Sequence, residues 1–222
     1  DSADFVLVDN LEQLSVKQTY INGELVYDNG KVLFETALAE AINSFSRKKI
    51  KQEDLIVKPQ KGMMRVINAF DGSLETGTEW VHPLIEGGQV ISDTMKDVLK
   101  IVVVNRYTNA KPSVAFIKGF DFNKGAIGGS IAHDSHNIIA VGVNDKAILK
   151  AVNGIIETRG GIVAVNNDTM SMLPLEVAGL MSREKGSFVA SRYQEINNMA
   201  KNLGTSMTSP FMTLSFMALL VI

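Results

Sequence analysis

The first part of the chain consists of short apolar or alternating runs that are separated by turn residues. These runs cover residues 5–8, 16–21, 24–27 and 31–34. Asn22-Gly23 and Asn29-Gly30 separate the last three runs. An Asn-Gly pair between alternating runs favours a two-residue hairpin turn, because both turn positions need a positive φ. The pattern therefore predicts a small β unit over residues 5–34.

The period of the apolar residues changes after this unit. Leu38, Ile42 and Phe45 recur at helical spacing, which predicts a helix over residues 35–49. The basic run that begins at Arg47 would then be the solvated end of that helix, where cations suit the helix dipole. A looser stretch follows, up to about residue 62. We therefore predict a β-rich segment with a helix over 1–50 and a second domain over 51–222.

The second domain mixes predicted strands and helices. Strands are predicted at 64–70, 98–104, 114–117, 138–143 and 162–165, with a turn-rich stretch over 71–88 between the first two. A helix is predicted between the last two strands, because Asn144 or Asp145 can cap it and Gly160-Gly161 can end it. A second helix is predicted over 184–203. The expected fold class is therefore α+β: a small β unit followed by a mixed α/β domain.

Composition and charge exclude several functional classes. The chain has 222 residues, of which 45% are hydrophobic and 21% charged, and its net charge of −2 gives no reason to expect nucleic acid as a partner. It contains no cysteine, which excludes disulfides and cysteine metal sites. The apolar stretch 211–222 is too short for a bilayer, which needs about 20 apolar residues. Because no secretory signal opens the chain, we expect a cytoplasmic protein without a membrane partner.

Both ends of the sequence run into apolar segments. The strand-like run 5–8 begins after four residues, and residues 219–222 are apolar with no polar tail. Natural termini usually lie at the surface and are polar or frayed. We therefore expect the chain to be part of a longer protein, and we expect its apolar ending, 211–222, to be a buried strand or a packing segment.

The densest cluster of polar residues lies at 133–137, between a glycine-rich segment and an apolar strand. The run Gly125-Ala-Ile-Gly-Gly-Ser-Ile-Ala-His-Asp-Ser-His-Asn137 holds His133 and His136, two of the chain's three histidines. Loops at strand ends carry function disproportionately. This loop is therefore the first place to look for chemistry.

Two kinds of site are disfavoured at this loop. Adjacent side chains point in different directions, so His133, Asp134 and Ser135 make a poor catalytic triad. A catalytic zinc site needs three protein ligands and an open position, and the spacing of His133, Asp134 and His136 matches no standard signature. Two interpretations stay open from the residues alone. The loop is either a polar surface presented to a small molecule or a neighbouring domain, or a hydrogen-bonded structural corner.

The run 125–145 closely resembles the C-terminal domain of bacterial and archaeal adenine deaminases. Further stretches match in the same order: Lys118-Gly-Phe120, Ile162-Val-Ala-Val165, Leu173-Pro-Leu-Glu-Val-Ala-Gly-Leu-Met-Ser182 and Pro210-Phe-Met-Thr-Leu-Ser-Phe216. Residues 3–9, continuing to Asn22-Gly23, resemble the β-rich segment that follows the barrel in amidohydrolases. The resemblance covers essentially the whole chain, and the His-Asp-Ser-His-Asn run is its most specific part.

The resemblance implies a reaction, a substrate and a metal. It implies hydrolysis of adenine to hypoxanthine and ammonia in purine catabolism, by a hydroxide on a divalent metal (manganese, iron or zinc). In the family the metal ligands lie in a (β/α)₈ barrel and include a His-x-His pair, which this sequence lacks. The chain is also too short for a barrel of about 250 residues beside its other segments. We therefore expect no metal site and no barrel in this chain, and no activity from it alone.

The resemblance also implies a role for the polar loop. We expect His133, Asp134 and His136 to act as catalytic groups accessory to the barrel site, and Ser135 and Asn137 to contact the substrate. The rest of the chain would pack on its own barrel or form a homo-oligomer contact.

Other classes of function make different predictions. A non-catalytic assembly or regulatory module predicts an exposed apolar patch, with 211–222 as the place to look, and no effect of the loop on chemistry. An independent enzyme that uses the loop itself predicts activity from the isolated chain with added metal. A different amidohydrolase substrate is compatible with the first segment alone.

Overall fold

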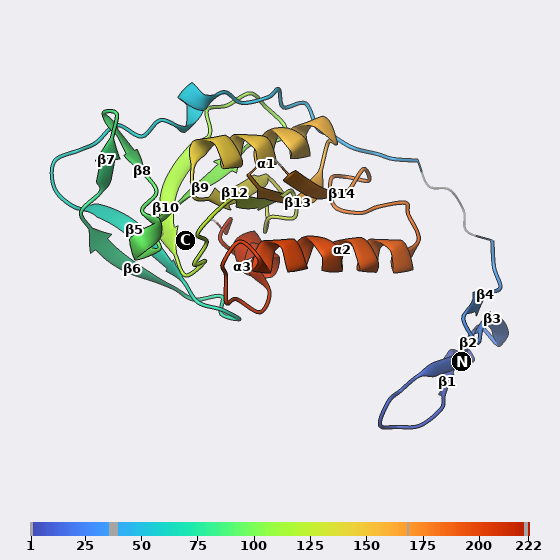
Figure 1. Ribbon diagram of the computed structural model, residues 1–222. Coiled ribbons are helices and arrows are strands. Elements are labelled where there is room, and N and C mark those ends of the chain that lie inside the picture. The colour runs from blue at the N-terminus through green and yellow to red at the C-terminus, as the bar shows by residue number, and fades with distance from the viewer. Residues whose placement is uncertain (1, 36–39, 168, 220–221) are drawn as a thin grey trace. The chain divides into compact units, whose positions relative to one another are not determined.

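A computed structural model describes residues 2–35, 40–167, 169–219 and 222 of the chain (Figure 1). The contacts between residues divide the chain into two units, Asp1–Ala39 and Glu40–Ile222. The predicted domain boundary between residues 50 and 51 stays a prediction. The two units are described separately.

The smaller unit is an antiparallel sheet with the order β1-β2-β3-β4. Its strands are β1 (Phe5–Val8), β2 (Val16–Ile21), β3 (Glu24–Asp28) and β4 (Lys31–Val32). The turn after β2 has φ of 52° at Asn22 and 80° at Gly23, and the turn after β3 has 43° at Asn29 and 93° at Gly30. Asn and Gly tolerate these left-handed angles better than other residues do. The predicted small β unit is confirmed.

The larger unit is built on a sheet with the order β14-β13-β11-β12-β9-β10-β5-β6. Its strands are β5 (Met64–Ala69), β6 (Thr76–Val81), β9 (Leu99–Val104), β10 (Ser113–Lys118), β11 (Ala126–Gly129), β12 (Ile138–Gly142), β13 (Gly161–Asn166) and β14 (Thr169–Pro174). β10 runs parallel to β5, and the other described neighbours are antiparallel. A separate hairpin pairs β7 (Leu84–Glu86) with β8 (Gln89–Ile91), and short 3-10 helices cover Gln52–Leu55 and Thr94–Lys96.

Helices cover both faces of this sheet (Figure 1). Helix α1 (Asp145–Glu157) lies on one face, and α2 (Gly186–Lys201) and α3 (Pro210–Phe216) lie on the other. Successive strand residues point to opposite faces. Ala140 and Val163 therefore pack in the core under α1, whereas Ile139 and Ile162 pack in the core under α2 and α3. Apolar residues on both faces explain the nearly continuous apolar runs of these strands.

The strand–helix–strand unit near the end of the chain is confirmed. β12 leads through α1 into β13, and β11 lies between these two strands in the sheet. The Asn144 side chain caps α1, accepting a hydrogen bond from the Ala147 backbone N–H at 2.8 Å. The described residues contain no (β/α)₈ barrel, so the α+β prediction without a barrel is also confirmed.

The predicted helix over 35–49 is wrong wherever the structure describes it. Residues 36–39 lie outside the described residues, and residues 40–49 form no helix. The backbone N–H groups of Ser46 and Arg47 instead donate to the Arg106 carbonyl at 3.0 and 3.1 Å. The Arg47 side chain is buried and donates to the carbonyls of Thr108 and Ala110, so it is not a solvated helix end. Long-range pairing to the segment after β9 has replaced the local helical hydrogen bonds.

The sequence analysis did not predict several strands, and it left the apolar ending, 211–222, as either a buried strand or a packing segment. β6 and β7 lie in the stretch that we expected to be turns, β11 covers the glycine-rich run, and β8 and β14 had no prediction. The apolar ending is a packing segment, because α3 buries Phe211 and Leu214 against the sheet.

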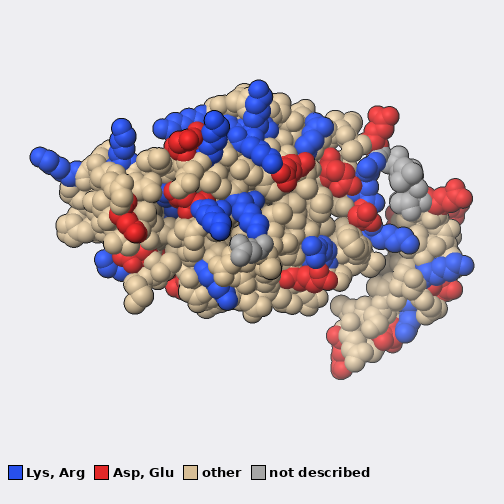
Figure 2. All heavy atoms as spheres, turned by 45° about the horizontal axis from the view of Figure 1, so that its top comes forward, with Lys and Arg blue, Asp and Glu red and all other residues tan. Residues whose placement is uncertain are grey.

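Every described helix is too short or too polar to span a membrane. Basic and acidic side chains are interspersed on the face of the larger unit that Figure 2 shows, as a net charge near zero would suggest.

Candidate functional site

The predicted loop connects two antiparallel strands at one end of the large sheet. β11 ends at Gly129, which pairs with Ile139 of β12, so the connection 130–137 projects beyond the strand ends. Ile138 pairs with Val104, the last residue of β9. The segment that follows β9 therefore lies beside the loop, although about 30 residues separate the two in sequence.

Ser130 fixes the base of the loop. Its backbone N–H donates to the Gly161 carbonyl at 3.0 Å, and its hydroxyl accepts from the Gly161 N–H at 2.9 Å. The same hydroxyl donates to the Gly179 carbonyl at 2.5 Å. Ser130 is fully buried, and these bonds satisfy its polar atoms. The loop is thus held by backbone from two distant segments.

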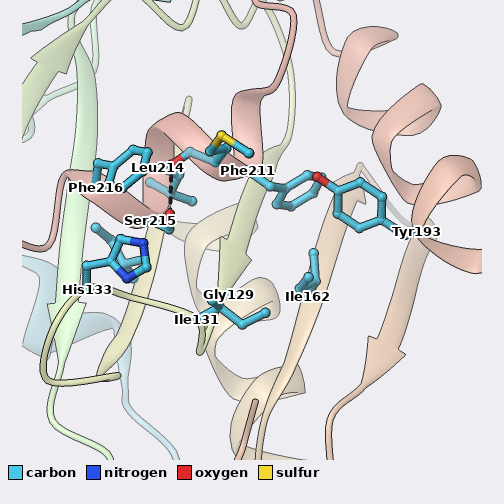
Figure 3. A pocket seen from close by; sticks show the side chains of 11 residues that line it. Gly129, Ile131, His133, Ile162, Tyr193, Phe211, Leu214, Ser215 and Phe216 are labelled. Carbon is cyan, nitrogen blue, oxygen red and sulfur yellow. Dashed lines mark hydrogen bonds between the residues drawn. The ribbon is translucent and has the colours of Figure 1, made fainter. Parts of the chain in front are cut away.

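His133 faces α3. Its backbone N–H donates to the Ser215 carbonyl at 3.1 Å, and its ring centroid lies 4.8 Å from that of Phe216. Figure 3 shows the His133 ring beside Phe216 at the edge of a cavity. Across the part of the chain that the structure describes, the His133 ring nitrogens make no hydrogen bond, so they are free to meet another molecule.

Asp134, Ser135 and Asn137 occupy the exposed side of the loop. The side chains of Asp134 and Ser135 are exposed, and Asn137 is half-buried. The Asn137 side-chain amide donates to the Ser135 hydroxyl at 3.0 Å and its oxygen accepts from the Arg106 N–H at 3.4 Å. The predicted polar residues are therefore brought together, with Asn137 tied to the end of β9.

His136 differs from the other loop residues. Its φ is 50°, in the left-handed region, and its backbone N–H donates to the Ala132 carbonyl at 2.7 Å. Its ring nitrogen Nδ1 is buried and has no hydrogen-bond partner among the described residues. A buried polar atom without a partner costs about 1–3 kcal/mol. Among the described residues of the loop, this nitrogen is the side-chain polar atom that is enclosed without a hydrogen-bond partner.

Sequence reasoning missed Arg106 and Tyr107, which hold the loop from the side. Arg106 is only 5% exposed, and it donates to the Ala178 carbonyl at 2.6 Å and to the Tyr107 hydroxyl at 2.9 Å. The Tyr107 hydroxyl in turn donates to the Ser135 carbonyl at 3.3 Å. A charged residue two positions after the apolar β9 run was the available signal, but nothing local indicated its partners.

Gly179 makes room for the Arg106 guanidinium. A Cβ at this glycine would lie 2.1 Å from Arg106 Nη1, and the φ of Gly179 is 70°. A larger residue here would have a strained backbone and would displace the Arg106 guanidinium. Arg106 and Gly179 therefore pack closely beside the loop, and the exposed Tyr107 bonds to its backbone.

The described residues do not fit a bound metal ion. Within 2–35, 40–167, 169–219 and 222, no three His, Cys, Asp or Glu side chains come close enough together to hold one. Catalytic metal sites need about three protein ligands.

The fold and the loop together define the class of domain: an α+β domain with a polar loop at one end of its sheet. The family model for the adenine deaminase C-terminal domain matches residues 73–222, and the chain belongs to this family. The expected family is thereby confirmed.

Relatives extend the similarity over the whole chain. Proteins named adenine deaminase are 50% identical in Methanosarcina barkeri, 43% in Salinibacter ruber and 38% in Borreliella burgdorferi, each over 100% of this chain. The matched regions are 42%, 41% and 41% of those proteins. The chain thus spans about two fifths of the length of these relatives.

Proposed function

We propose that this chain is the C-terminal part of an enzyme that converts adenine and water to hypoxanthine and ammonia. The names of the relatives and their identity over the whole chain support this substrate and this reaction. Metal dependence, a place in purine catabolism, a cytoplasmic location and a homo-oligomer belong to the same proposal. The barrel and any metal ligands would come from residues outside this chain.

The loop 133–137 would support or close the active site of that enzyme. The single observation that carries this role is the buried, unpartnered Nδ1 of His136, in a loop that Ser130 and Arg106 hold in place. Rigid support is what a binding or proton-transferring imidazole needs.

The other loop residues have chemistry that suits an adenine edge. Asp134 is exposed and can accept hydrogen bonds from a ring N–H or an amino group. The Ser135 hydroxyl and the Asn137 amide can donate to ring nitrogens. In this proposal His133, Asp134 and His136 bind the substrate or move protons, and Ser135 and Asn137 orient the ring.

The proposal is tested with His136→Ala in the complete protein encoded by the gene. We expect adenine turnover to fall about tenfold or more, in line with the usual contribution of a positioned acid–base group. His82→Ala is the matched control, because His82 is an exposed histidine outside the loop. Wild-type kinetics for His136→Ala, with ammonia release as the measurement, would rule out the role of the loop.

A non-catalytic assembly module is the second candidate. This candidate predicts an exposed apolar patch at 211–222. Within the described part of that segment, Phe211 and Leu214 are instead buried, and Met212 is exposed. The feature that favours it is Trp80, which is 59% exposed on the edge strand β6. Aromatic residues are enriched in protein interfaces relative to the rest of the surface. Trp80→Ala should then change the oligomeric state in solution and leave turnover per active site unchanged.

A further inference from the structure

A cleft of about 440 Å³ opens within the large sheet, between β5 and β10. In the sheet order these two strands are interior neighbours, with β9 on one side and β6 on the other. They nevertheless pair with each other only over 67–68 and 117–118. Residues from the preceding halves of both strands, 64–66 and 113–116, line the cleft instead of pairing. The sheet is therefore split at this end.

The split leaves two backbone edges without a partner strand. β10 pairs through its other edge with β9 over 113–117, and β5 pairs through its other edge with β6 over 64–69. A strand edge without a neighbour presents a row of unpaired N–H and C=O groups. An extended peptide binds such an edge by adding a strand, and the backbone hydrogen bonds contribute its affinity.

Side-chain burial changes along β10 at the same point. Ile117, in the paired half, is fully buried, whereas Ser113 and Ala115, in the split half, are exposed. These three residues lie on one face of the sheet, because side chains alternate along a strand. The difference in burial therefore follows the split and not a change of face.

The lining of the cleft combines apolar and cationic side chains. Met64 and Phe116 pack in a core cluster on one face of the sheet. Arg65 lies on the opposite face, directly across from Trp80 of β6. Lys58 also lines the cleft, and no Asp or Glu does so among the described residues. Neither Lys58 nor Arg65 forms an ion pair with a described residue, so the complementary charge is negative.

An added strand would meet the two faces alternately. Its apolar side chains would reach Met64 and Phe116, and its acidic side chains would reach Arg65, with Lys58 as a second cation. A phosphate group would satisfy the cations but would leave the backbone edges unpaired. The lining therefore favours an extended peptide in which acidic and apolar residues alternate.

The complete protein contains further residues from which such a peptide can come. This chain covers 42%, 41% and 41% of three relatives named adenine deaminase, so each of them is more than twice as long. A segment of the same polypeptide binds at an effective concentration of about millimolar. Ile222, which is far from β5 and β10 in sequence, already contributes to the lining, and Figure 1 shows the C-terminus beside these strands. Segments distant in sequence therefore reach the cleft.

We propose that the cleft between β5 and β10 holds an extended segment of the complete protein, from outside these 222 residues, as an added β-strand. Its acidic side chains face Arg65 and Lys58, and its apolar side chains face Met64 and Phe116. The proposal rests on the split in the sheet and does not depend on the adenine reaction, so its tests measure contact and pairing instead of turnover.

Carbodiimide cross-linking of the complete protein, read by mass spectrometry, identifies the segment. The reagent joins a lysine amine to a carboxylate in contact with it, so we expect Lys58 to be linked to an Asp or Glu outside these 222 residues. Lys58→Arg is the matched control, because it keeps the charge but removes the amine, and the link should disappear. Mixing ¹⁵N-labelled with unlabelled protein shows whether the link lies within one copy. No Lys58 link, a link only within these 222 residues, or a link between copies would overturn the proposal.

Hydrogen exchange tests the pairing itself. Arg65→Glu places a like charge against the acidic strand, and we expect amide exchange over 113–116 in the complete protein to become about fivefold faster. Lys48→Glu is the matched control, since Lys48 is exposed and does not line the cleft. Circular dichroism checks the fold, and if Arg65→Glu does not fold, the neutral Arg65→Gln should fold and give a smaller increase. Exchange as slow as in wild type in a folded Arg65→Glu or Arg65→Gln variant would contradict the acidic strand.

Discussion

The two faces of the large sheet are covered in different ways. Under α1, the core is closed: Ile148, Val152 and Ile155 are fully buried, and Gly128 leaves no spare room beside Ile155. Under α2 and α3, the core contains a cavity, and the polar loop contacts α3 at its edge. Both faces bury an apolar core, but only the face under α2 and α3 also has a cavity and, beside it, a histidine without hydrogen-bonded ring nitrogens among the described residues.

The largest expected effect concerns a charge buried in the closed face. Lys100 is 1% exposed, and its Nζ lies 2.5 Å from Asp145 Oδ1 and 3.0 Å from the Leu55 carbonyl. Asp145→Ala removes the counter-charge and leaves a buried ammonium, so we expect the free energy of unfolding to fall by about 3–5 kcal/mol. Urea unfolding of the chain measures this loss.

The matched control removes both charges. Lys100→Met combined with Asp145→Ala should recover most of the stability, because removing both members of a buried ion pair leaves no uncompensated charge. A single Asp145→Ala variant within about 0.5 kcal/mol of wild type would show that the pair is solvated and that the α1 face is not closed.

A pair of truncations compares the two faces directly. Ile155→Ala empties a fully packed position under α1, and Leu214→Ala enlarges a cavity that already exists under α3. Large-to-small changes in a core cost about 2–5 kcal/mol, and the cost is highest where the removed side chain was tightly surrounded. We expect Ile155→Ala near the upper end and Leu214→Ala near the lower end in urea unfolding. Equal decreases in the free energy of unfolding would mean that the two faces are packed alike.

The same comparison explains how much of the fold could be predicted from the sequence. The strands near 98–104, 138–143 and 162–165 and the helix between the last two were predictable, because both faces are apolar and the caps are local. The helix expected at 35–49 failed because Ser46 and Arg47 bond to Arg106, a partner that no local pattern contains. The strand β11 was hidden by Gly128 and Gly129, because glycine is depleted in strands and so gives no strand signal.

The residues of the candidate site could be predicted from the sequence, but the residues that hold the loop in place could not. His133, Asp134, Ser135, His136 and Asn137 are contiguous, so their shared loop could be predicted from the run itself. Their supports could not, because Arg106 and Tyr107 follow β9, and the cavity beside His133 depends on α2 and α3. Such contacts are set by the order of strands in the sheet, which a local pattern does not specify.

The smallest expected effect compares two adjacent glycines. Gly128→Ala should destabilise the chain by about 1 kcal/mol, since its Cβ would lie 3.2 Å from backbone and side-chain atoms that must move. Gly129→Ala has ordinary contacts, so it should be neutral or stabilise by up to about 1 kcal/mol through the unfolded state. Urea midpoints of the two variants measured side by side give the difference. The reverse order of stabilities would place the spare room under α1 and would contradict the assignment of a closed and an open face.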